Sequence, residues 1–179
     1  MKKTKRIVVI SVLCCLSVVL DIIKGFIPFI NMPGGGSINI SLIPIVVCSF
    51  TMGLKDGMVC SILSYLISTI LGLNSYFLNI FQYLFDYIIP TICVGLCSMF
   101  YKNKNIKEME FGIIVAMILR FLSIVISGAY FWLDSTVIAG SKEAFIASSV
   151  INFPYSFGTL IVLLISTPLI VKAINKYLL

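Results

Sequence analysis

The sequence predicts an all-α membrane protein with six transmembrane helices, and three observations support this. Of its 179 residues, 60% are hydrophobic and only 11% are charged, whereas soluble domains carry roughly 25% charged residues. The apolar residues fall into six long segments, and the basic residues cluster between these segments. A chain of this length fits one domain, so we expect residues 1–179 to form a single unit that faces lipid.

A helix that crosses a bilayer needs about 20 mostly apolar residues. Six segments are candidates, of which the second and third are short: 6–30, 38–54, 57–73, 79–101, 111–133 and 145–175. The first resembles a secretory signal, but it continues past Asp21 without a small-residue cleavage motif, so we expect it to remain as a helix. Pro90 is expected to kink the fourth helix, and Pro154 and Pro168 to kink or break the sixth.

The basic residues predict the orientation of the helices. Ten of the 13 Lys and Arg residues lie at the two ends of the chain or in the segments 54–57 and 102–110, and Lys142 is the one basic residue between helices on the opposite side. Because basic residues accumulate on the cytoplasmic side, both termini are expected inside a multi-pass protein of the cell membrane. Clusters between apolar spans also argue against nucleic acid as a partner.

Several classes of enzyme are excluded by missing residues. The chain contains no histidine, no phosphate-binding GxxxxGK[ST] loop, no GxSxG motif and no pair of carboxylates within one span. Its six cysteines all lie in apolar segments, and none has the spacing of a metal site. We therefore expect a protein that binds or moves a solute, without enzymatic activity, cofactor or metal.

Four ionisable residues lie within the predicted spans, where charges are costly and often functional. Asp21 and Lys24 are one helical turn apart and are expected to pair with each other. Asp86 lies in the aromatic stretch FQYLFDYIIP and can accept a ligand cation. Arg120 can instead neutralise Asp86 or Asp21, which leaves a structural alternative for both carboxylates.

Polar and aromatic side chains gather toward the outer ends of the last three helices. They include Tyr87 next to Asp86, Tyr130 and Trp132 at the end of the fifth helix, and Asn152 near the start of the sixth. Such a pocket suits a small organic cation, because each ring face contributes about 0.5–2 kcal/mol of cation–π energy. The alternatives are a headgroup contact for Trp132 and an interhelical hydrogen bond for Asn152.

Two further features concern loops and partners. Residues 31–37 contain three consecutive glycines, among them Gly35, and form either a plain turn or a loop over the pocket. On the first helix, Ser11 and Cys15 are four residues apart, and small residues at this spacing allow close helix contact in lipid. They serve either internal packing or docking on another membrane subunit.

The chain resembles the thiamine-specific substrate-binding (S) components of energy-coupling factor transporters. The similarity is clearest in GGSINISLIPI (35–45), LFDY (84–87), RFLSIVISGAYFW (120–132) and the start of the last helix around Asn152. The resemblance implies a six-helix protein that captures thiamine or a related cation outside the cell. It also implies partners, namely one transmembrane coupling subunit and two ATPase subunits that drive substrate release inside.

The resemblance assigns roles to individual residues. Asp86 occupies the place of an acid near the thiazolium, Tyr87 matches the adjacent aromatic residue, Trp132 a stacking ring, and Asn152 a contact to the pyrimidine. The glycine loop, with Gly35, corresponds to a loop that covers the site, and Ser11 and Cys15 match a docking motif.

The sequence departs from this family pattern at two positions. Ile124 stands where the family commonly has histidine, and a tyrosine is replaced near Ala147. With these losses the chain either binds thiamine weakly or serves as an S component for a thiamine precursor or another vitamin. A separate alternative is a stand-alone, proton-coupled thiamine transporter.

Overall fold

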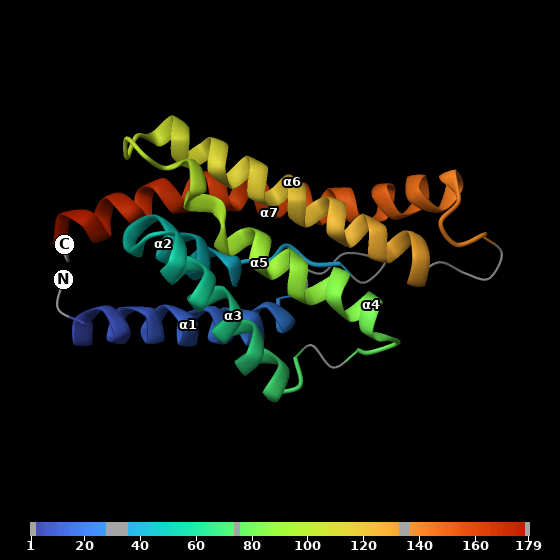
Figure 1. The fold of residues 1–179 in the computed structure, drawn as a ribbon, viewed down its shortest axis with the longest axis horizontal. Coiled ribbons are helices and arrows are strands. Elements are labelled where there is room, and N and C mark those ends of the chain that lie inside the picture. Colours follow the sequence, from blue (N-terminus) through green and yellow to red (C-terminus); the bar gives the residue numbers. More distant parts are fainter. Residues whose placement is uncertain (1–2, 28–35, 74–75, 133–136, 178–179) are drawn as a thin grey trace.

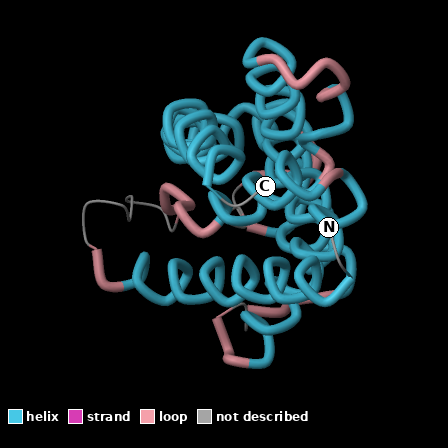
Figure 2. The backbone as a smooth tube through the Cα atoms, turned by 90° about the vertical axis from the view of Figure 1, so that its left-hand side faces the viewer, coloured by secondary structure: helices cyan, strands magenta, loops and turns pink. Residues whose placement is uncertain are grey.

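The predicted six-helix fold is confirmed by a computed structural model, which describes residues 3–27, 36–73, 76–132 and 137–177. Both termini lie at the same end of the helix bundle (Figure 1), and the described chain consists of helices and loops (Figure 2). The helical elements are α1 (Lys3–Gly25), α2 (Leu42–Met52), α3 (Leu54–Ile70), α4 (Ile80–Tyr83), the π-helical turn η2 (Leu84–Ile88), α5 (Ile89–Gly95), the 3-10 turn η3 (Cys97–Phe100), α6 (Ile106–Phe131) and α7 (Lys142–Tyr177).

Four helical segments of the described chain are long and apolar enough to cross a membrane: α1, the composite segment Ile80–Phe100, α6 and α7. As expected, α2 and α3 are shorter, with 11 and 17 residues. At 1.5 Å per residue α2 is roughly 16 Å long, about half the hydrocarbon thickness of a bilayer. Eight of its residues are buried, so α2 forms the centre of the core rather than a lipid-facing span.

The starts of three helices are fixed by polar caps in the loops. Asn79 before α4, Asn105 before α6 and Ser141 before α7 each accept a hydrogen bond from the backbone N–H three residues later, at 2.9, 2.8 and 3.1 Å. Such caps satisfy N–H groups that a helix cannot bond internally. They explain why the chain turns at these points despite its continuous hydrophobicity.

Of the two outcomes predicted for the prolines of the last helix, a kink or a break, the break is not found. Pro154 and Pro168 both lie inside α7, which continues over 36 residues. Each proline removes one backbone hydrogen bond, but α7 is packed along α6 and α2, and such packing tolerates proline in membrane helices. The irregular helix is instead the fourth, which is divided into α4, η2, α5 and η3.

Close packing at the end of the bundle near the termini depends on Gly112 in α6. A Cβ atom at this position would lie 2.0 Å from the backbone carbonyl oxygen of Cys97 in η3. We therefore predict that Gly112→Ala lowers the free energy of unfolding by about 1–3 kcal/mol, because the helices must move apart. Gly25→Ala is the matched control, since no atom lies within 4 Å of its added Cβ. Equal melting temperatures for the two variants in detergent would contradict this packing.

Candidate functional site

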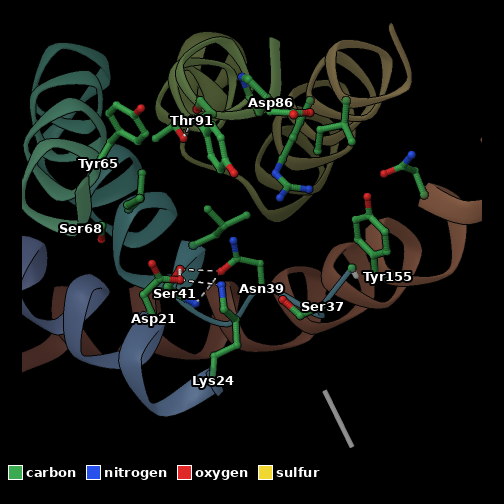
Figure 3. A pocket seen from close by; sticks show the side chains of 18 of the residues that line it. Asp21, Lys24, Ser37, Asn39, Ser41, Tyr65, Ser68, Asp86, Thr91 and Tyr155 are labelled. Atoms are coloured by element: carbon green, nitrogen blue, oxygen red, sulfur yellow. Dashed lines mark hydrogen bonds and ion pairs between the residues drawn. The ribbon is translucent and has the colours of Figure 1, made fainter. Parts of the chain in front are cut away.

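A cavity of about 390 Å³ lies between the helices in the half of the bundle that is distant from the termini. It is enclosed by the end of α1, the segment 36–42, α3, the η2–α5 region, the end of α6 and the first half of α7. Figure 3 shows Asp86 on one side of this cavity, Tyr155 on another, and the Asp21–Lys24 pair facing both. The cavity is therefore lined by both charged and aromatic side chains.

Asp86 has one oxygen engaged and one available. Its Oδ2 accepts hydrogen bonds from Gln82 Nε2 and from Trp132 Nε1, both at 2.6 Å. Neither donor carries a charge, and Oδ1 has no partner among the described residues. The two donors orient the carboxylate without neutralising it, so its negative charge remains available to a ligand in the cavity.

The π-helical turn explains how Asp86 is positioned. Pro90 has no N–H, so it cannot bond the Asp86 carbonyl as an ordinary helix residue would. The backbone instead widens over Leu84–Ile88, and the N–H of Ile89, just before the proline, donates to the Leu84 carbonyl five residues earlier. The carbonyl of Phe85 accepts from Ser123 Oγ of α6 at 2.7 Å, which fixes the turn against α6. Single π-helical turns of this kind often occur at functional sites.

Aromatic rings surround the carboxylate. Tyr87 lines the cavity, and its ring centre lies 5.1 Å from that of Tyr83. Trp132 also lines the cavity and stacks on Tyr76 at 4.5 Å with an interplanar angle of 29°. A cation near Asp86 would therefore meet ring faces as well as a negative charge.

Arg120 lies in the same cavity as a buried cation that has no anionic partner among the described residues. It is 9% exposed, and its Nη1 forms no hydrogen bond with the described residues. Among the described residues, Arg120 forms no ion pair with Asp86 or with Asp21, although the sequence allows both. Burying an unpaired charge costs several kcal/mol, so a ligand with hydrogen-bond acceptors would offset part of this cost.

The expected pair of Asp21 and Lys24 is present on the side of the cavity formed by α1. Lys24 Nζ lies 2.6 Å from Asp21 Oδ1, and Ser41 Oγ donates to the same oxygen at 3.3 Å. Asn39 joins the network by accepting from Ser41 and by donating its backbone N–H to Thr159 on α7. Because this carboxylate is already neutralised, Asp21 is a weaker partner for a ligand cation than Asp86.

The predicted polar face of α7 also lines the cavity. Asn152 Nδ2 donates to the backbone carbonyl of Ser148 at 2.8 Å, and to its hydroxyl at 3.2 Å. Both of these side-chain hydrogen bonds use the amide nitrogen of Asn152, so its side-chain oxygen can accept a hydrogen bond from a ligand. Gly36 packs directly on the ring of Tyr155, where an added Cβ would lie 2.0 Å from a ring carbon. This contact brings the end of the glycine loop against the cavity wall.

The cavity includes four of the six predicted ligand-binding residues: Asp86, Tyr87, Trp132 and Asn152. Tyr130 is not among its lining residues. It is 49% exposed, and its ring packs against Phe145. The reason is helical geometry: Tyr130 is two residues before Trp132 on α6 and so faces away from it. Gly35 lies outside the described residues.

The predicted docking residues lie on α1, and the position of the family histidine lies on α6. Ser11 and Cys15 are exposed on the outer face of α1, away from the cavity. Ile124 is buried and lines the cavity, so the position where the resemblance implies histidine forms an apolar wall.

Sequence reasoning missed α3 as a wall of the cavity. Ser64, Tyr65 and Ser68 of this helix all line it. Their spacing of i, i+1 and i+4 places polar groups along one side of an otherwise apolar helix, and this pattern could have identified them. Tyr155, three residues after Asn152 on the same face of α7, lines the cavity as well.

Comparisons with known proteins agree with this architecture. The model of the family described as thiamine transporter protein matches residues 7–179. The chain is 32% identical to the thiamine transporter ThiT of Bacillus subtilis over 142 residues, which cover 73% of this chain and 72% of the relative. It is 28% identical to the riboflavin transporter RibU of Lactococcus lactis over 143 residues, which cover 73% of this chain and 64% of RibU.

The fold is also that of a solved structure. The structure of ThiT from Listeria monocytogenes aligns with a TM-score of 0.74 and 21% sequence identity, and covers 96% of this chain and 97% of that one. The described helices and these relatives identify a multi-pass membrane protein whose homologues are transporters, not enzymes. The chain belongs to the thiamine transporter protein family.

Proposed function

We propose that this chain is the membrane-embedded binding subunit for thiamine uptake, and that it delivers the vitamin through an ATP-driven energy-coupling module. The observation that carries the proposal is Asp86, a carboxylate in a cavity with aromatic walls and no cationic partner among the described residues. A permanent cation such as a thiazolium ring would supply the missing partner. Cation–π contacts with Tyr87 and Trp132 would add about 0.5–2 kcal/mol each.

The rest of thiamine fits the remaining polar groups. Its aminopyrimidine has an exocyclic amine, which can donate to the amide oxygen of Asn152, and ring nitrogens, which can accept from Arg120. Hydrogen bonds to a charged donor contribute about 1.5–3 kcal/mol. In this assignment the thiazolium pairs the charge of Asp86, and the pyrimidine supplies the hydrogen-bond acceptor that Arg120 lacks among the described residues. Ile124 adds an apolar contact where histidine would add a polar one, so weaker binding than in other family members is expected.

Riboflavin is the second candidate, because RibU is similar over most of this chain. The two vitamins differ in charge: thiamine carries a fixed cation, whereas the flavin ring is neutral. A neutral ring gains no charge pairing from Asp86, which is why we favour thiamine.

Fluorescence of the single tryptophan tests the choice of ligand. Trp132 lines the cavity and bonds Asp86, so thiamine should change its emission with a saturable 1:1 curve. Riboflavin should not displace bound thiamine in equilibrium dialysis. Displacement by riboflavin, or absence of thiamine binding by both methods, would contradict the proposed substrate.

Delivery to a coupling module is proposed from α1. Ser11 and Cys15 are small residues on an exposed helix face, where close contact with another membrane helix is possible. The sequence has no phosphate-binding GxxxxGK[ST] loop, so ATP hydrolysis must come from partner subunits.

A bulky residue on this face should separate binding from transport. We predict that Ser11→Trp abolishes co-purification with a coupling subunit and thiamine uptake in cells, while purified protein still binds thiamine. Ile165→Trp is the matched control, because Ile165 is 63% exposed on α7, another lipid-facing helix. Normal uptake by Ser11→Trp, or uptake in cells that lack ATPase subunits, would instead favour a stand-alone transporter.

A further inference from the structure

A second groove, of about 280 Å³, lies at the end of the bundle where both termini are found. It is formed by the loop that precedes α6, the first turn of α6 and the last turns of α7. Four of its lining residues are apolar, namely Ile106, Met109, Pro168 and Val171, and they are called its apolar floor below. None of these residues lines the larger cavity, so the groove is a separate feature of the molecule.

The rim of this groove is basic. Lys104 and Lys172 approach it from the loop and from α7, and Tyr101 and Asn175 add hydrogen-bonding groups. Neither lysine forms an ion pair with the described residues. The carboxylate of Glu108 accepts hydrogen bonds from the backbone N–H and the side-chain amide of Asn103, so it is engaged within the loop and forms no ion pair with either lysine.

The backbone also holds Lys104 in an unusual conformation. Its φ of 55° lies in the left-handed region and makes it the one described non-glycine residue with positive φ. Lysine is not among the residues that favour this region. Lys104 therefore adopts its backbone conformation at some energetic cost, and it lines the groove.

We propose that this groove binds a phospholipid with an anionic headgroup. The phosphate would lie between Lys104 and Lys172, within reach of donors from Tyr101 and Asn175, and an acyl chain would cover the apolar floor. Lys172 lies in the last two turns of α7 and Lys104 just before α6, so both are at the ends of membrane-spanning helices, where headgroups lie. Basic pockets between such helices are suited to acidic lipids.

The groove is also well placed to remain in contact with lipid. It belongs to α6 and α7, whereas the exposed Ser11 and Cys15 face belongs to α1 on the other side of the bundle (Figure 1). A partner bound to α1 would leave the lipid site open. The lipid proposal does not depend on the identity of the transported vitamin.

Native mass spectrometry of the full-length protein in detergent tests this site. Purified protein is mixed with phosphatidylglycerol or phosphatidylcholine of equal chain length, and retained lipid is counted. We expect retention of phosphatidylglycerol, and roughly 30-fold weaker retention by the double variant Lys104→Gln, Lys172→Gln, since each basic residue contributes about fivefold. The double variant Lys55→Gln, Lys142→Gln loses the same charge elsewhere and should retain lipid like the wild type.

Three outcomes would overturn the proposal. They are equal retention of phosphatidylglycerol by the wild type and the Lys104, Lys172 variant, equal retention of phosphatidylcholine, and displacement of the lipid by millimolar inorganic phosphate. The last result would indicate a site for free phosphate. The midpoint of thermal unfolding, measured on each variant in the same detergent, verifies that the protein is folded whether or not it binds thiamine.

Discussion

Asp86→Asn is expected to lower the affinity for thiamine by about 30-fold to 5,000-fold, which corresponds to the 2–5 kcal/mol lost when one member of a buried charge pair is removed. Asparagine keeps an oxygen that can accept from Gln82 and Trp132, so the geometry of the turn should persist. The loss therefore reports the charge. Isothermal titration calorimetry is the suitable measurement, because the substitution also alters the environment of Trp132.

Two controls separate charge from shape. Asp86→Glu retains the negative charge and should retain most of the affinity, whereas Glu143→Gln removes an exposed carboxylate in the first turn of α7 and should change nothing. The neutral aminopyrimidine half of thiamine should bind Asp86→Asn and the wild type within about threefold, since it has no charge to pair. Equal losses for thiamine and for the neutral fragment would show that Asp86 acts by shape or packing.

Arg120→Met is expected to stabilise the ligand-free protein. The guanidinium is buried and forms no ion pair in the described structure, and its Nη1 has no hydrogen-bond partner there. Replacing buried ionic groups by packed apolar side chains can stabilise proteins by about 1–4 kcal/mol. Because Arg120 faces a cavity that water can enter, we expect about 1–2 kcal/mol, measured as a higher midpoint of thermal unfolding in the same detergent.

Arg6→Met provides the contrasting variant and should have the opposite sign. Arg6 donates to both oxygens of Asp56, with Nε at 2.7 Å and Nη2 at 2.6 Å, and the Asp56 side chain is only 6% exposed. Removing Arg6 leaves this buried carboxylate without its cation, so the unfolding midpoint should fall. A lower midpoint for both variants would mean that Arg120 is paired in solution and would weaken the case for an incomplete site.

The sequence predicted the class of fold because hydrophobicity and charge distribution follow directly from the membrane environment. It also located Asp86, Tyr87, Trp132 and Asn152 near one another, since each lies toward the same end of its helix. Prolines were harder to interpret. Pro90 lies next to the π-helical turn, whereas Pro154 and Pro168 leave α7 unbroken, because this helix is packed along α6 and α2.

The pairing of charges could not be predicted from the sequence. Asp21 and Lys24 are neighbours on one helix, so their contact is local and predictable. Whether Arg120 reaches Asp86 depends on the rotation and spacing of two different helices, and the π-helical turn alters both. The rotation of α6 likewise explains why Trp132 lines the cavity and Tyr130 does not.

The position of bound thiamine is the most direct test of the account. An experimental structure of the full-length protein with thiamine should place the thiazolium in the cavity, beside the Asp86 carboxylate and against the ring of Tyr87 or Trp132. A complex in which the vitamin lies outside this cavity, or in which Asp86 forms an ion pair with Arg120 while thiamine is bound elsewhere, would contradict it.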